Sequence, residues 1–81
     1  MMSPISPIGK EIKRRLAQAG WTQRTLARIM GRPEQAISEI VHGKRRVTVR
    51  TASELESVLG ASAMFWLKMD ARYRIDTKGG R

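Results

Sequence analysis

The sequence contains no cysteine and only one histidine, His42, among its 81 residues. Without cysteine the chain forms no disulfide and offers neither a cysteine-ligated zinc site nor a thiol nucleophile. A single histidine cannot supply a histidine-rich metal site or the paired histidines of an HExxH motif. No nucleophile–base pair and no pair of carboxylates is placed as a catalytic cleft requires, so we expect neither enzymatic activity, nor a metal, nor a cofactor.

Long apolar segments are also missing. The longest apolar runs fall far short of the roughly 18 residues that a membrane span needs, and the first residues lack the apolar core of a signal peptide. The chain of 81 residues has room for one small domain. We therefore expect a soluble, cytoplasmic protein with a single domain.

Acidic residues are few, since seven Asp and Glu face 16 Lys and Arg and leave a net charge of +9. Such a field favours polyanionic partners, which include nucleic acid, ribosomal RNA and anionic membrane surfaces. The densest basic segment comprises Lys44, Arg45, Arg46 and Arg50, and it follows a slightly acidic segment rich in hydrogen-bonding side chains. This arrangement favours separate phosphate-binding and base-reading segments, although an ordinary solvated basic loop would give the same run.

Glycine follows four segments whose apolar residues recur at helical spacing, at Gly20, Gly31, Gly43 and Gly60. A helix C-terminus favours a left-handed residue, and glycine adopts that conformation without strain. The signals predict five helices, over residues 7–19, 23–30, 33 to 41 or 42, 63–74, and between Thr48 and Gly60. No segment alternates with period two, so the predicted fold class is all-α.

Cap signals and apolar faces support these helices. We expect N-caps at Ser6, Thr22, Thr48 and Ser62, with Pro33 as the first residue of the third helix. The inward residues are predicted to be Ile8, Ile12, Leu16, Ala19, Leu26, Ile37, Ile40, Val41, Ala52, Leu55, Val58 and Leu59. The ends of the chain look frayed, which predicts a flexible arm over residues 1–6, a domain over 7–75 and a flexible tail over 76–81.

The second and third predicted helices, joined by a glycine turn, match the helix-turn-helix plan. Residues 22–31 (TQRTLARIMG) and 37–45 (ISEIVHGKR) resemble the lambda-repressor-like, XRE-type helix-turn-helix family, and the five-helix frame extends this resemblance over nearly the whole chain. Residues 65–73 (FWLKMDARY) resemble the end of the HigA (VapI-like) antitoxin subfamily. The resemblance implies a bacterial homodimer that represses its own operon at a palindromic operator. It also implies that the protein neutralises a RelE-like ribonuclease toxin in a type II, HigBA-type toxin–antitoxin pair.

In this motif the N-terminal residues of the second motif helix face the bases. Carried over to this chain, the resemblance assigns base reading to Glu34, Gln35, Ser38 and Glu39, although an acid such as Glu34 in a first helical turn also complements the helix dipole. The expected phosphate-binding residues are Gln23, Arg24, Lys44, Arg45, Arg46 and Arg50. We assign His42 no chemistry.

The last predicted helix carries the most aromatic strip of the chain. Neighbouring positions on a helix point about 100° apart, so one inward face cannot hide Phe65, Trp66 and Leu67 together. We expect Phe65 in the core and a homodimer interface formed by Trp66, Met69 and Tyr73, with core packing of the whole strip as the alternative.

Other functions are compatible with the same charge. A stand-alone XRE-type or prophage regulator would have the same motif and no toxin. A basic adaptor for ribosomal RNA or protein would bind without reading sequence. Membrane attachment through the first helix is disfavoured because its stripe of Ile8, Ile12 and Leu16 is narrow and needed for the core.

Overall fold

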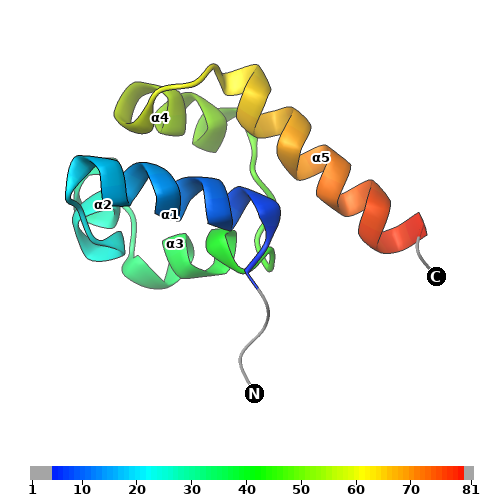
Figure 1. The fold of residues 1–81 in the computed structure, drawn as a ribbon, viewed down its shortest axis with the longest axis horizontal. Coiled ribbons are helices and arrows are strands. Elements are labelled where there is room, and N and C mark those ends of the chain that lie inside the picture. The colour runs from blue at the N-terminus through cyan, green and yellow to red at the C-terminus, as the bar shows by residue number, and fades with distance from the viewer. Residues whose placement is uncertain (1–4, 80–81) are drawn as a thin grey trace.

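The computed structural model describes residues 5–79, which form five helices and no strand within that range (Figure 1). The helices are α1 (Pro7–Ala19), α2 (Gln23–Met30), α3 (Glu34–Val41), α4 (Val49–Leu59) and α5 (Ala63–Gly79). The all-α, five-helix prediction is confirmed.

Each of the four predicted N-caps makes its hydrogen bond. The hydroxyl oxygens of Ser6, Thr22, Thr48 and Ser62 accept from the backbone N–H three residues later, at 3.1 to 3.2 Å. Pro33 differs from the prediction, because its ψ of 146° is extended and makes it the N-cap of α3. A cap residue lies outside the helical region of φ and ψ, so α3 begins one residue later, at Glu34.

The core lies where the apolar faces of all five helices meet. Its fully buried members include Ile8, Ile12, Leu26, Ile37, Ile40, Val41, Ala52, Leu55 and Trp66. Val58 and Leu59 are partly buried against this cluster. Ala19 is exposed, contrary to the prediction, because it is the last residue of α1 and the chain turns away at the left-handed Gly20.

The ends of the domain differ from the predicted boundaries. Ser6 is buried, and its N–H and hydroxyl both donate to the carbonyl of Val41 at 3.0 Å, while Ile5 packs on the core. At the other end α5 continues to Gly79, so residues 76–79 of the predicted tail are helical. The segment 75–78 contains neither glycine nor proline, and Arg72 pairs with Asp76 one turn later, which explains the longer helix. Residues 1–4 and 80–81 of the predicted arm and tail lie outside the described range.

The helices pack so that α3 keeps an outer face. α2 and α1 pack against α3, and α5 packs against α4 and α1. The C-terminal half of α5 extends past the rest of the body (Figure 1). Among residues 5–79 no helix has both the length and the apolar character needed to cross a membrane.

Candidate nucleic-acid interface

α2 and α3 form the two arms of a helix-turn-helix. α2 ends at Gly31, whose φ of 69° lies in the left-handed region, and its N–H bonds back to the last turn of α2. Leu26 and Ala27 are buried, and α2 packs against α3. On α3 the buried residues are Ala36, Ile37, Ile40 and Val41. The remaining positions of this eight-residue helix therefore form a polar outer face.

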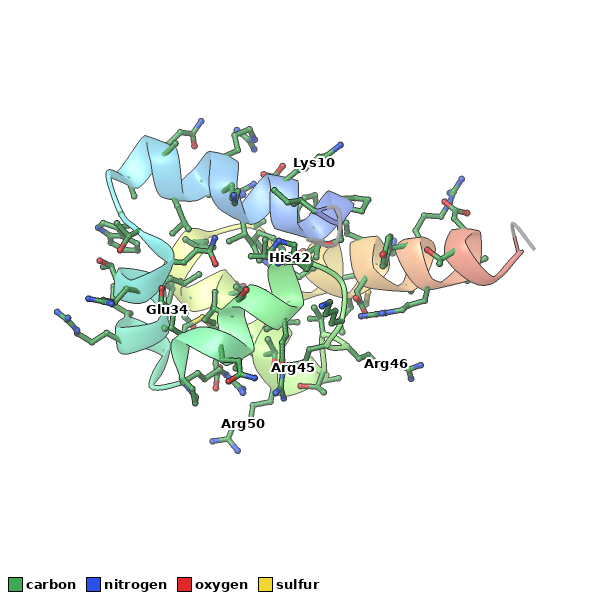
Figure 2. All side chains as sticks on the ribbon, turned by 90° about the horizontal axis from the view of Figure 1, so that it is seen from below. Lys10, Glu34, His42, Arg45, Arg46 and Arg50 are labelled. Carbon is green, nitrogen blue, oxygen red and sulfur yellow. The ribbon has the colours of Figure 1, made fainter. Side chains whose placement is uncertain are left out.

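All four predicted base-reading residues lie on this outer face. Glu34 and Gln35 are exposed, while Ser38 and Glu39 are half-buried. Positions 34, 35, 38 and 39 share one side of a helix because they are one and four residues apart. Figure 2 shows α3 with Glu34 near its beginning and Arg45 near its end. The geometry that base reading requires is present, and the reading of bases itself stays a prediction.

The carboxylate of Glu39 is already bound by its neighbours. It accepts from Nε and Nη2 of Arg45 at 3.0 and 2.7 Å, and from the Gln35 amide at 3.4 Å. The hydrogen bond from Arg45, followed by that from Gln35, holds the pKa of Glu39 below its ordinary value. Two residues that the sequence assigned to separate roles therefore form one ion pair. The sequence separation of six positions concealed this pair, because the two side chains meet only when the chain turns at Gly43.

The predicted phosphate-binding residues flank α3 at both ends. Near its beginning Arg24 is largely exposed and lies 3.5 Å from Glu34, and Gln23 is the first residue of α2. Near its end lies the segment 43–47, which we call the basic loop because it carries Lys44, Arg45 and Arg46. α3 is about 12 Å long. The two groups therefore bracket a surface of the size that one major groove accepts.

A hollow of about 450 Å³ lies between the end of α2, the basic loop and the beginning of α4. Four arginines line it, namely Arg32, Arg45, Arg46 and Arg50. A single carboxylate, Glu54, faces them and pairs with Arg32 at 2.8 Å and Arg50 at 3.5 Å. The side chains of Arg46 and Arg50 project outward beside α3 (Figure 2). Glu39 pairs with Arg45, and even these two carboxylates do not balance four guanidinium groups, so the hollow attracts anions.

Sequence reasoning missed Arg32 as a member of this hollow. Its signal was its place in the turn between the two motif helices, directly before the cap of α3. The residue also has a structural role, because its ion pair with Glu54 ties the turn to α4.

The aromatic strip on α5 divides differently from the prediction. Trp66 is fully buried, and its Nε1–H donates to the carbonyl of Gly60 at 3.1 Å. The prediction that it lies in a dimer interface is wrong, because it faces inward among α1 and α4 and has no surface left for a partner. Phe65, expected in the core, is only half-buried. The two rings meet edge to face, with centroids 5.2 Å apart, so Phe65 covers one side of the buried indole.

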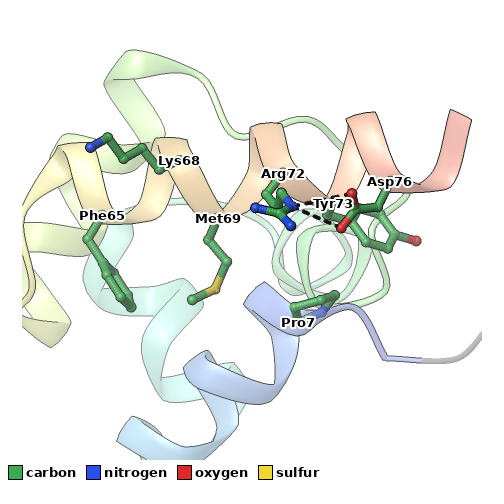
Figure 3. A pocket seen from close by; sticks show the side chains of 7 residues that line it. All are labelled: Pro7, Phe65, Lys68, Met69, Arg72, Tyr73 and Asp76. Carbon is green, nitrogen blue, oxygen red and sulfur yellow. Dashed lines mark hydrogen bonds and ion pairs between the residues drawn. The ribbon is translucent and has the colours of Figure 1, made fainter. Parts of the chain in front are cut away.

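Met69 and Tyr73 are accessible, as their predicted role requires. They line a groove of about 560 Å³ between α5 and the beginning of α1, together with Phe65, Pro7, Lys68, Arg72 and Asp76 (Figure 3). We call this the α5 groove. Its floor is apolar, and the Arg72–Asp76 ion pair lies at one end.

Comparison with known proteins agrees with this geometry. The helix-turn-helix family model matches residues 12–66. One similar structure is that of a protein from Nostoc punctiforme PCC 73102 described as a candidate antidote protein of a plasmid maintenance system. It is 26% identical, with a TM-score of 0.83, and the match covers 98% of this chain and 86% of that one.

A second similar structure is an addiction module antidote protein of a HigA family from Coxiella burnetii. It is also 26% identical, with a TM-score of 0.75 over 98% of this chain and 89% of that one. No curated protein matches the chain. The predicted likeness to XRE-type helix-turn-helix proteins and to HigA-family antidotes, and with it the lambda-repressor-like fold, is confirmed.

Proposed function

The chain belongs to the helix-turn-helix family of DNA-binding domains, and from this premise we propose that it is a sequence-specific, dimeric repressor of its own operon and the antitoxin of a HigBA-type pair. The observation that carries the DNA-binding part is the outer face of α3. Polar side chains line that face, cationic groups flank it at both ends, and apolar residues hold its opposite side in the core.

The proposed roles follow from the chemistry of each side chain. Gln35 pairs with the N6 and N7 edge of adenine, and the Ser38 hydroxyl donates or accepts. Glu39 accepts from the N4 amine of cytosine with Oε2, the oxygen that Arg45 leaves free. The Glu34 carboxylate interacts favourably with the positive end of the α3 dipole, and it contacts a base only at the edge of the site.

The flanking residues, of which all but Gln23 are cationic, bind the DNA backbone. Gln23 and Arg24 serve one strand, while Lys44, Arg45, Arg46 and Arg50 serve the other. If a dimer makes about six such contacts, the logarithm of its affinity falls with the logarithm of salt concentration at a slope of about −5.

The dimer is proposed to form through the α5 groove, with Met69 and Tyr73 at its centre. Two protomers related by a twofold axis would present their α3 helices to successive major grooves, about 34 Å apart, on a palindromic operator. An apolar floor with charged side chains around it is the usual composition of such an interface.

The antitoxin part rests on the two similar structures, since both are described as antidotes of plasmid maintenance or addiction modules. We accordingly propose a RelE-like ribonuclease as the protein partner. The alternative is a stand-alone XRE-type regulator with the same DNA contacts.

A mobility-shift assay on the protein's own promoter tests these proposals. The wild type should prefer the promoter over a scrambled duplex of equal length, and the product of the neighbouring gene should supershift the complex. Gln35→Ala should lose roughly 1 to 3 kcal/mol on the promoter and little on scrambled DNA, because it removes one base contact. Gln18→Ala, the same change at an exposed position of α1, is the matched control.

The outcomes separate the parts of the proposal. Equal binding to promoter and scrambled DNA would contradict sequence-specific repression and favour the adaptor. Promoter preference without a supershift would contradict the antitoxin role and leave the stand-alone regulator. Equal losses for Gln35→Ala on both duplexes would remove Gln35 from the base-reading set.

A further inference from the structure

The backbone of the basic loop is held by α5, which is remote from it in sequence. Nη1 of Arg74 donates to the carbonyl of Gly43 at 2.7 Å, and Nη2 donates to the carbonyl of Arg45 at 2.9 Å. Asp70, one turn earlier on α5, accepts from the N–H of Val47 at 3.3 Å. Nη2 of Arg74 also lies 3.2 Å from the Asp70 carboxylate. One ion pair therefore fixes the loop at its beginning, middle and end.

These contacts go to backbone atoms and leave the basic side chains free of α5. Arg45 is held at both ends, because its carbonyl binds Arg74 and its guanidinium binds Glu39 on α3. Gly43 has a φ of 73°, and a Cβ built there would lie 2.7 Å from the Tyr73 ring. Tyr73 of α5 therefore packs closely against Gly43, where the loop leaves α3.

The i,i+4 spacing of Asp70 and Arg74 stabilises α5 only slightly, which does not account for the burial of the carboxylate. The Asp70 side chain is almost fully buried, and a buried carboxylate is costly unless it is paired and hydrogen-bonded. A buried ion pair rarely stabilises a protein more than apolar side chains of similar size would. The pair instead holds the loop in one conformation, because each of its three hydrogen bonds to the loop goes to a different backbone atom.

We propose that Asp70 and Arg74 are positioning residues for DNA binding, which fix the basic loop so that Lys44, Arg45 and Arg46 face the phosphates before DNA arrives. This inference rests on the DNA-binding function proposed above. A loop that is already ordered loses less conformational entropy on binding, so its phosphate contacts contribute more fully to affinity.

Arg74→Lys tests the proposal while keeping a positive charge beside Asp70. A single ammonium lacks the planar fork with which the guanidinium reaches two carbonyls and a carboxylate together. Asp70→Asn is the second variant, because it keeps an acceptor for Val47 and removes the charge. Arg14→Lys is the matched control, on an exposed part of α1 where, among residues 5–79, arginine pairs only with Glu11.

Three measurements are made on the full chain: the salt dependence of binding to promoter and scrambled duplexes, the amide hydrogen exchange of Val47 in the free protein, and the urea unfolding midpoint. Arg74→Lys should weaken binding to both duplexes by the same factor. Loss of one phosphate contact per protomer should make the slope of a dimer shallower by about two units. The amide of Val47 should exchange faster, and Arg14→Lys should match the wild type in every measurement.

A purely structural role predicts a different result. It would lower the unfolding midpoint and the active fraction, and it would leave the salt slope of the active protein unchanged. The positioning role alone would be overturned if the wild type prefers its promoter and both Arg74→Lys and Asp70→Asn keep the salt slope of the wild type. A wild type that binds no duplex at low salt would overturn the proposed function and the positioning role with it.

Discussion

At Gly9, helix propensity and packing predict opposite effects of an added methyl group. Gly9 lies inside α1 and is buried, and a Cβ built on it would lie 2.0 Å from the carbonyl oxygen of Val41 and 2.7 Å from Ile5 Cγ2. By propensity alone, Gly9→Ala should stabilise the helix by about 1 kcal/mol. By packing it should destabilise the fold, because a contact near 3.5 Å would require α1 and the end of α3 to move apart by more than about 1 Å.

The structure indicates which effect is larger. Overpacking of a close contact costs about 1 to 3 kcal/mol. The obstructing Val41 carbonyl also accepts the two hydrogen bonds that Ser6 donates, and moving it away weakens two bonds worth about 1 kcal/mol each. Against a gain of about 1 kcal/mol from propensity, we expect a net loss of about 2 to 4 kcal/mol in the free energy of unfolding. That is a large share of the roughly 4 to 12 kcal/mol expected for a domain of this length.

Urea unfolding followed by helical circular dichroism measures this loss. Ala17→Gly is the control, because Ala17 is exposed on the same helix and its replacement should show the propensity effect alone, a loss of about 1 kcal/mol. A Gly9→Ala protein at least as stable as the wild type would refute the reasoning, since it would mean that the end of α3 yields to the methyl group without cost.

Three further predictions concern the core, the α5 groove and the ion pair between α3 and the basic loop. Trp66→Ala should cost about 3 to 5 kcal/mol in urea unfolding because the indole is fully buried. Met69→Glu in the α5 groove should dissociate the proposed dimer in sedimentation, with a smaller loss of protomer stability because Met69 is only partly buried against the core. A Trp66→Ala loss under about 1 kcal/mol, or a Met69→Glu dimer of normal affinity, would contradict this division. In an NMR titration, Glu39 should have a pKa below the ordinary glutamate value, and Arg45→Ala should raise it toward that value. The pKa of Glu39 is lower in the folded than in the unfolded state, so its stabilising contribution is present above about pH 4.3 and is lost as the pH falls through the folded-state pKa. A Glu39 titration that Arg45→Ala leaves unchanged would exclude the ion pair.

The sequence was sufficient where the cause of a structure is local. Ser6, Thr22, Thr48 and Ser62 cap helices because the N–H that each hydroxyl binds is three residues away. Spacing on α3 was likewise sufficient to put the predicted base-reading residues on one outer face, since apolar periodicity defines the opposite face.

Tertiary contacts were beyond the sequence. Periodicity separates Phe65 from Trp66 by about 100° on α5, but only the way α5 crosses α1 and α4 decides which ring is buried. The contacts of Arg74 with the basic loop join residues 29 and 31 positions apart, and no local pattern encodes them. The pairing of Arg45 with Glu39 needs the turn at Gly43 and was missed for the same reason.

The two stripes of α5 explain how one helix serves both the fold and the candidate interface. Trp66, Asp70 and Arg74 recur every four residues and lie on one stripe, which packs into the core at its beginning and holds the basic loop at its end. The adjacent stripe, which includes Met69 and Tyr73, lines the α5 groove. Of these two groove residues, Tyr73 also presses on Gly43 and stacks beneath the guanidinium of Arg74, at 5.5 Å from the ring centroid. The proposed dimer and the position of the loop can therefore be tested separately by changing Met69, whereas a change at Tyr73 alters both.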